Sequence, residues 1–174
     1  MNLGSFKVLL ELCGYPQSGP GNGGAGSRGV SVVAQSAVAQ TVTGTTNQTV
    51  LASVTIPAGS VSPNGVVRIT PLFTFTNNAN VKNLSITFGG ATVLNTNQTN
   101  AAALQSLHLV RNRGVLNSQV MMSAGSAGIG PSTGLAAASA VDTSQAVALV
   151  FSGTLANASD SITLEGYTVE VLNP

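Results

Sequence analysis

Residues 49–90, TVLASVTIPAGSVSPNGVVRITPLFTFTNNANVKNLSITFGG, decide the fold of this chain. The stretch holds three runs rich in Val, Ile, Thr and Phe, residue types that favour a pleated, half-buried surface. Pro57, Asn64, Gly65 and the Asn-rich residues 77–80 separate the runs and suit tight turns. The stretch therefore predicts three consecutive short strands without an intervening helix.

β-prone runs continue on both sides of this stretch. Eight or more short strands with turn residues at such spacing favour a sandwich or jelly roll. We therefore predict an all-β fold, a jelly-roll β-sandwich, for residues 30–174, preceded by an extended N-terminal arm. The predicted strands are 30–33, 41–45, 49–56, 66–75, 83–88, 91–94, 106–110, 119–123, 146–151 and 161–172.

Two segments of this domain depart from a simple strand pattern. Pro71 lies inside a predicted strand, and because proline cannot donate to a sheet ladder, that strand should lie at an edge or carry a bulge. Residues 125–140, GSAGIGPSTGLAAASA, are small and low in complexity. We expect them to form a long loop, in which residues 136–140 could make one turn of helix.

The first 29 residues predict an anchoring arm. A compact apolar patch is followed by a flexible tract rich in Gly, Pro and Ser at residues 16–29, which has no core of its own. This layout is typical of an arm that docks onto another protein, and an element that folds back on its own domain is the alternative. The candidate anchoring residues are Phe6, Val8, Leu9, Leu10 and Leu12.

The composition predicts self-association. Only 6% of the residues are charged, against about 25% in an ordinary domain, and 43% are hydrophobic, with a mean hydropathy of +0.34. The polar side chains are mostly Asn, Thr, Ser and Gln, so close contact of like subunits carries little electrostatic cost. The six basic residues are scattered except for Arg111 and Arg113, which disfavours nucleic-acid binding. No apolar run reaches the roughly 18–20 residues of a membrane-spanning helix, so we expect no membrane partner.

Residues able to carry chemistry are few. Cys13 is the only cysteine, so no intrachain disulfide or cysteine metal cage is expected. His108 is the only histidine and has no ligand at metal-binding spacing, so we expect it in a strand or at a subunit interface, where it could line a threefold axis. Glu165 and Glu170 lie in one predicted strand at an odd spacing and should therefore point to opposite faces. We predict no catalytic, cofactor-binding or metal-binding residues.

Arg111 and Arg113 stand two residues apart beside a predicted turn and should project to one side. They could hold a carboxylate of a neighbouring molecule or of a glycan. The favoured alternative is a solubilising edge that discourages unwanted strand pairing.

The central stretch resembles virion structural proteins of tailed bacteriophages. The resemblance lies in the "LA-x-VTIPAG" strand of residues 51–59, the "NG-x-x-RI" hairpin of residues 64–69, the Asn-rich turn of residues 77–80 and the Lys-leading strand ending in "FGG" at residues 82–90. Where such sequences carry a bulky aromatic and a serine in the second strand, this chain has Phe73 and Phe75. The resemblance implies a jelly-roll domain, usually trimeric, that serves as a capsid decoration, head fibre or tail-fibre module, and it brings no catalytic residues with it.

The sequence thus leads to one main functional hypothesis and one alternative. The main hypothesis is a non-enzymatic virion protein without cofactor, a homotrimer anchored by its arm to the major capsid protein or another virion protein. The alternative is a receptor-binding or glycan-binding tail-fibre module that contacts a host-surface glycan. Trp is absent and aromatic residues make up only 4% of the chain, so stacking platforms for sugars are scarce.

Overall fold

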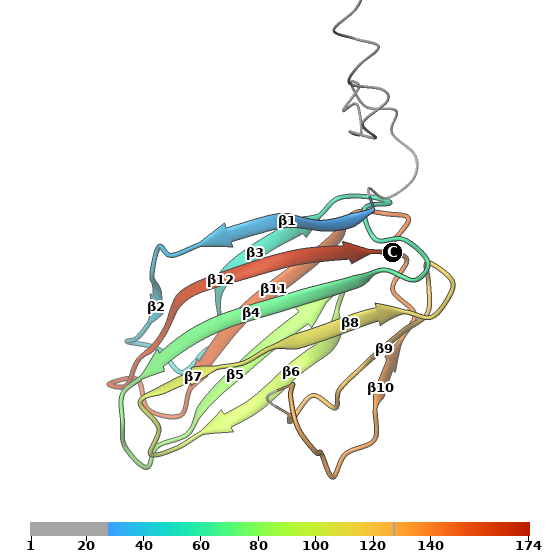
Figure 1. Cartoon of the computed structure of the whole chain (residues 1–174). Helices are drawn as coiled ribbons and strands as arrows, with labels where there is room; N and C mark the ends of the chain where they lie inside the picture. Colours follow the sequence, from blue (N-terminus) through green and yellow to red (C-terminus); the bar gives the residue numbers. More distant parts are fainter. Residues whose placement is uncertain (1–27, 127) are drawn as a thin grey trace, which may run out of the picture.

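Two antiparallel sheets packed face to face form the domain, a β-sandwich, in the computed structural model, which describes residues 28–126 and 128–174 (Figure 1). The all-β prediction is therefore confirmed. The strands are β1 (Gly29–Ser36), β2 (Gln40–Val42), β3 (Thr49–Ile56), β4 (Val66–Phe75), β5 (Lys82–Phe88), β6 (Ala91–Gln98), β7 (Ala103–Gln105), β8 (His108–Asn112), β9 (Gln119–Met121), β10 (Ala137–Ser139), β11 (Val147–Leu155) and β12 (Ile162–Asn173).

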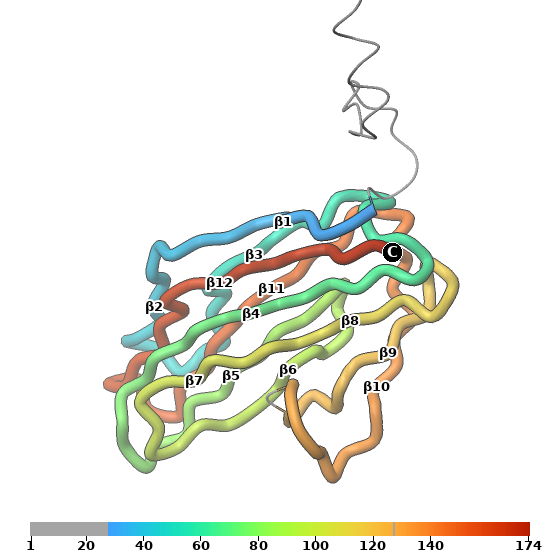
Figure 2. Tube along the Cα trace, in the orientation of Figure 1, coloured from blue at the N-terminus to red at the C-terminus, as the bar shows by residue number. Residues whose placement is uncertain are grey.

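The larger sheet has eight strands and the smaller sheet has four. In the larger sheet the order is β1, β12, β4, β8, β9, β10, with β2 also paired to β12 and β7 also paired to β4. The smaller sheet has the order β3, β11, β5, β6. Figure 2 shows that β2 continues the path of β1 along β12 and that β7 and β8 follow one path along β4. Each pair therefore acts as one long strand with an interruption.

Strand pairing is nested along the chain. The first strands, β1 and β2, pair with the last strand, β12, and β3 pairs with β11. Further inward, β4 pairs with β7 and β8, and β5 pairs with β6. The chain is thus arranged like a long ribbon folded in half, and its successive strands from β2 to β5 alternate between the two sheets. β9 and β10 extend the larger sheet beyond this ribbon.

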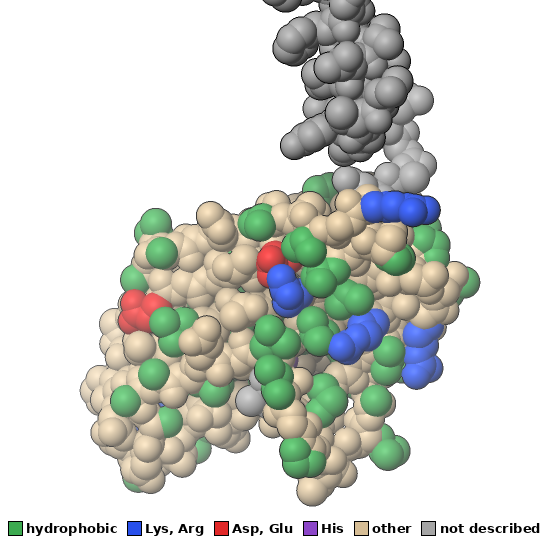
Figure 3. Space-filling view, viewed as in Figure 1, with side chains coloured by type: hydrophobic (Ala, Val, Ile, Leu, Met, Phe, Trp, Pro, Cys, Tyr) green, Lys and Arg blue, Asp and Glu red, His purple; other side chains and the backbone are tan. Residues whose placement is uncertain are grey.

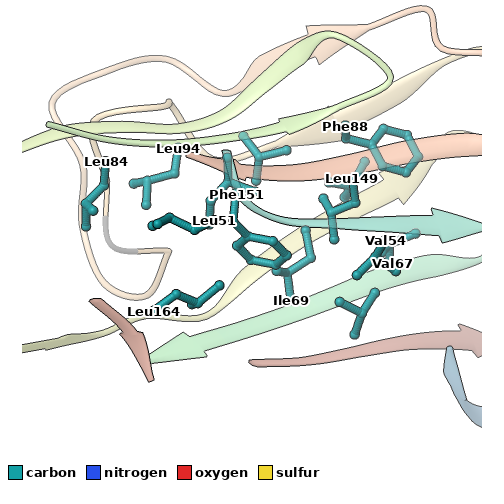
Figure 4. Packing of buried hydrophobic residues seen from close by; sticks show 14 of the residues in the cluster. Leu51, Val54, Val67, Ile69, Leu84, Phe88, Leu94, Leu149, Phe151 and Leu164 are labelled. Atoms are coloured by element: carbon teal, nitrogen blue, oxygen red, sulfur yellow. The ribbon is translucent and has the colours of Figure 1, made fainter. Parts of the chain in front are cut away.

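The hydrophobic core lies between the sheets because their strands alternate between buried and half-buried residues. In β5, Leu84, Ile86 and Phe88 point inward, and every second residue faces outward. Phe151 of β11 is fully buried among Leu51, Ile69 and Leu149 (Figure 4). Its ring stacks on Tyr167 of β12 with ring centroids 5.1 Å apart, so it links the two sheets.

The central stretch folds as its sequence predicts. The strands predicted at 49–56 and 66–75 are β3 and β4, with the same bounds. Gly89 and Gly90 make the tight turn between β5 and β6, and both have positive φ angles, 54° and 83°. Such angles are strained for residues with a side chain, which explains why glycine occupies this turn.

The prediction that the strand of Pro71 lies at a sheet edge is wrong, because β4 is an interior strand between β12 and β8. The interruption lies instead in the neighbouring path, between β7 and β8. Ser106 in that gap donates its backbone N–H to the Pro71 carbonyl. Because the N–H and C=O of one residue point to the same neighbour in an antiparallel pair, the missing N–H of Pro71 faces this gap. The hydrogen-bond ladder along this side of β4 is therefore interrupted at Pro71, which has no backbone N–H.

The segment 125–140 also differs from its prediction. Ala137–Ser139 form strand β10, which pairs with β9, so the expected helical turn at 136–140 is wrong. The sequence also missed β7, whose three residues, Ala103–Gln105, pair with residues 72–74 of β4. Both strands are short and are defined by their neighbours in the sheet.

Candidate functional site

Most of the buried polar and charged side chains of this domain belong to hydrogen-bond networks. Lys82, at the start of β5, has no exposed surface. Its Nζ donates to the Asn78 carbonyl (3.1 Å), to Asn78 Oδ1 (2.7 Å) and to the Asn80 carbonyl (2.8 Å). All three donor sites of the ammonium group are therefore used within the Asn-rich turn.

Asp160 completes this network from the loop between β11 and β12. It accepts hydrogen bonds from Asn78 Nδ2 (2.6 Å) and Asn80 Nδ2 (3.0 Å). The hydrogen bond from Asn78, together with Asn80 and the charge of Lys82, lowers the pKa of the Asp160 carboxyl against the opposing effect of its burial. Lys82, Asn78, Asn80 and Asp160 thus hold two loops together at one end of the sandwich.

A second network lies at the opposite end of the sandwich, where β8 ends and β9 begins. Gln119 of β9 has no exposed surface, and its amide nitrogen donates to Asn112 Oδ1 (2.9 Å) and to the Val141 carbonyl (2.9 Å). Asn112 in turn donates to the Ser62 carbonyl and to Thr143 Oγ1. Since these donors and acceptors satisfy one another, the network fixes the loops around β9 and leaves few groups for a ligand.

His108 lies in a strand, as predicted, and its side chain is buried within the sandwich itself. It is only 2% exposed, and its Nε2 lies 2.9 Å from Ser106 Oγ. Gly128, in the long loop before β10, packs against this part of the chain. A Cβ at Gly128 would overlap the Leu107 carbonyl and would lie 3.3 Å from His108 Nδ1. This burial lowers the pKa of His108 to about 4, so the ring is neutral at pH 7.

The burial of His108 predicts a pH-dependent stability. An unfolded histidine has a pKa of about 6.5, so the unfolded chain binds more protons than the folded one between pH 6.5 and 4. The stabilisation is complete above pH 6.5 and is lost as the pH falls through this window. We expect the free energy of unfolding to drop by about 2 kcal/mol between pH 7.5 and pH 5.

Urea denaturation at the two pH values measures this loss, and the variant His108→Gln provides the control. Glutamine keeps a polar group near Ser106 but does not titrate, so its stability should be nearly equal at both values. The carboxyl groups with lowered pKa, Asp142, Asp160 and Glu170, lose their contribution only below about pH 4.5. An equal loss in both proteins would contradict the assignment to His108.

The predicted opposite orientation of Glu165 and Glu170 is wrong. The register between β12 and β4 shifts between Leu164 and Gly166. Because of this bulge, both carboxylates lie on the same face of the sheet. Glu165 accepts a hydrogen bond from Thr74 Oγ1 (2.5 Å), and Glu170 forms a bidentate ion pair with Arg68, with Nε 2.6 Å from Oε2 and Nη2 2.8 Å from Oε1. Both residues therefore lie on the outer face of the larger sheet.

Arg111 and Arg113 are both exposed, but only Arg111 lies within a strand. Arg111 pairs in register with Val66 of β4 and Val120 of β9, so β8 is an interior strand rather than an edge. Arg113 belongs to the turn that leads to β9, where its backbone N–H donates to the Ser118 carbonyl. The favoured interpretation of the pair as a solubilising sheet edge is therefore wrong for Arg111.

The outer face of the larger sheet carries a hollow next to the β7–β8 interruption. This cavity of about 310 Å3 is lined by Thr70, Gln105, Ser106, Leu107 and Ile129. Ile129 is 75% exposed, so apolar surface rims the hollow and hydroxyl and amide groups lie inside it. No aromatic residue lines it.

The remaining predictions concern the anchoring residues, metal binding and the membrane. The anchoring residues Phe6, Val8, Leu9, Leu10 and Leu12 lie outside the residues that the structure describes. Within residues 28–126 and 128–174, no three His, Cys, Asp or Glu side chains are grouped so that they could hold a metal ion. In the same part of the chain, no helix has the length and apolar character needed to cross a membrane.

Comparison of the chain with models of known protein families found no match, and comparison with curated proteins found none either. The fold and these side chains therefore define the protein as a β-sandwich with structurally engaged polar networks.

Proposed function

We propose that this chain is a non-enzymatic structural protein of a tailed-bacteriophage virion, a trimeric capsid-decoration or head-fibre component built on a jelly roll. The nested strand pairing is the observation that carries the proposal. Counting the interrupted paths as single strands, four strands in each sheet follow the order β1/β2, β12, β4, β7/β8 and the order β3, β11, β5, β6. This order supports a jelly roll, an architecture common in viral capsid domains.

The position of the phage-like motifs in the fold also supports this proposal. Residues 51–59 belong to β3 and the turn after it, residues 64–69 open β4, and residues 82–90 form β5 and its hairpin turn. Residues 77–80 are the turn that Lys82 and Asp160 hold in place. The resemblance therefore concerns the scaffold of the domain, as expected for a protein whose role is structural.

The engagement of the acidic side chains supports a role without catalysis. Each carboxylate of the described residues serves the scaffold: Glu165 binds Thr74, Glu170 binds Arg68, Asp142 binds Ser144, and Asp160 binds Asn78 and Asn80. General acid–base catalysis needs such groups free to reach a substrate. In this chain they are committed to turns, loops and strand pairs.

The arm of residues 1–29 would attach the trimer to the capsid. Burying a few hundred Å2 of its apolar side chains corresponds to about 5–10 kcal/mol before the cost of ordering the arm. Three arms in one trimer would add avidity. In this proposal the protein is part of the virion, with the major capsid protein or another virion protein as partner.

Virions of the virus that encodes the chain provide the test. We expect the double variant Leu9→Asp and Leu10→Asp to be absent from purified particles, although it remains folded. The matched control, Ser18→Asp and Asn22→Asp, adds the same charge to the Gly-rich tract and should be incorporated normally. Quantitative mass spectrometry of particles measures both, and full incorporation of the Leu9/Leu10 variant would overturn the anchor.

A glycan-binding tail-fibre module is the second candidate, and the hollow beside β7 is the observation that favours it. Gln105, Ser106 and Thr70 could donate hydrogen bonds to a sugar there. A glycan array with the full-length protein tests this role, with Gln105→Ala as the matched variant. Binding that disappears in the variant would support the second candidate, and an array without signal would remove it.

A further inference from the structure

The outer face of the larger sheet carries two cross-strand rows in which apolar side chains flank a few charged ones. Residues directly opposed in an antiparallel ladder share one face, so the strand registers define these rows. The first row crosses six strands and consists of Val30, Leu172, Val66, Arg111, Val120 and Ala138. The second row crosses four strands and consists of Val32, Glu170, Arg68 and Leu109. Figure 3 shows hydrophobic side chains gathered on this face around an acid–base pair.

On the smaller sheet, the outer face of the β5–β6 pair is polar. There, Ser85 is opposed to Asn95, and Asn83 is opposed to Asn97. Asn83 Nδ2 donates to both Asn95 Oδ1 (2.7 Å) and Asn97 Oδ1 (2.8 Å), so these amides form a ladder of their own. The two rows on the larger sheet therefore differ in character from the β5–β6 pair, and the outer face of the larger sheet is the better candidate for a protein interface.

The charges on the outer face of the larger sheet are complementary to those of a second copy. Arg68 and Glu170 neutralise each other in its middle. Arg111 is exposed and forms no ion pair within the described residues, and Glu165 binds only the Thr74 hydroxyl. Seven residues of β12 separate the row of Arg111 from Glu165, or about 23 Å at 3.3 Å per residue. One end of the face thus has an unpaired cation and the other end an anion without a cationic partner.

We propose that this outer face is the interface between copies of the chain, with Arg111 of one subunit beside Glu165 of its neighbour. The inference rests on the proposed function for the number of subunits and adds which surface joins them. In a closed ring each interface uses one end of the face from each subunit, so one such ion pair forms per interface. The apolar side chains of the two rows, at the Arg111 end of the face, supply the burial, and the ion pair fixes the register.

Charge reversal tests the ion pair in the full-length protein. Arg111→Glu and Glu165→Arg each place like charges together, and we expect each to raise the dissociation constant of the assembly at least about tenfold. The double variant restores opposite charges and should return to within about threefold of the unaltered protein. Arg113→Glu, in the turn outside the sheet, changes the net charge equally and should have no effect. Sedimentation equilibrium measures all four, and single variants that assemble normally would overturn the pair.

A matched pair of valines tests the apolar surface. Val32 on β1 is 55% exposed and lies on the proposed interface, whereas Val50 on β3 is 59% exposed and lies in the smaller sheet. Lysine at either site should leave the subunit folded, which circular dichroism checks. We expect Val32→Lys to weaken assembly at least about tenfold and Val50→Lys to have little effect. Equal effects of the two changes would overturn the assignment of this face.

The outcomes separate this inference from the proposal it rests on. If the unaltered protein is a trimer and the variants of Val32, Arg111 and Glu165 are trimers of equal affinity, another surface joins the subunits and the trimer stands. If the unaltered protein is a monomer, both the trimer and this interface are wrong.

Discussion

Replacing Lys82 with methionine is expected to lower the free energy of unfolding by about 3–5 kcal/mol, because it removes one member of a buried, fully bonded charge network. Methionine retains an apolar stem of similar length but offers no donor. The Asn78 side chain and the Asn80 carbonyl would lose their bonds to Nζ, and Asp160, only 3% exposed, would lose the nearby positive charge. Buried acceptors without partners carry their full desolvation cost.

Chemical denaturation at pH 7.5 measures this effect, with Thr87→Met as the control. Thr87 lies on the same strand but faces outward, so the control adds a methionine without touching the network. Its expected change is within about 0.5 kcal/mol. A double-mutant cycle with Asp160→Asn should show a coupling above about 0.5 kcal/mol. A Lys82→Met variant as stable as the unaltered protein would show that the network contributes nothing to stability.

Truncating Phe151 to alanine is expected to cost about 3–5 kcal/mol. Its ring is fully buried at the centre of the core and stacks on Tyr167, with an angle of 24° between the rings. The truncation removes apolar area, leaves a cavity and breaks the contact that joins β11 to β12. β11 is paired on both sides, with β3 and with β5, so its backbone can move only partly into the space.

Two further variants separate these contributions of Phe151. Phe151→Leu keeps most of the volume and should cost less than about 1.5 kcal/mol. Tyr167→Phe keeps the stacked ring and should be close to neutral. Thermal or urea unfolding of the three proteins gives the comparison, and a cost below about 1 kcal/mol for Phe151→Ala would place the ring outside the cooperative core.

Local sequence patterns were enough to predict the strands that carry strong alternation. β3 and β4 are bounded by Pro57 and by Asn64 and Gly65, and both patterns place apolar residues on one side. β7 and β10 are three-residue strands whose existence depends on partners far along the chain. Ala137–Ser139 are strand because β9 pairs with them, although alanine prefers a helix.

The positions of the charged side chains were harder to predict, because whether such a residue is buried depends on which face of the sheet its place in the strand gives it. Lysine is rarely buried without a partner, so Lys82 reads as a surface residue when considered alone. A usable signal was present, since Lys82 shares the inward phase of Leu84, Ile86 and Phe88. Glu165 and Glu170 were misplaced because a bulge lies between them, next to Gly166. A glycine inside a strand often marks such a bulge, so the sequence carried a signal here as well. The common face of Arg111 and Glu165 depends on long-range register and could not be read from spacing.

The mass of the full-length protein in solution tests the central claim most directly, because the proposed trimer and its interface both require sandwiches that associate with their own copies. Sedimentation equilibrium over a range of protein concentrations at pH 7.5 gives this mass without reference to shape. The account predicts three times the chain mass of 17.3 kDa. A mass of one chain at every concentration would contradict it.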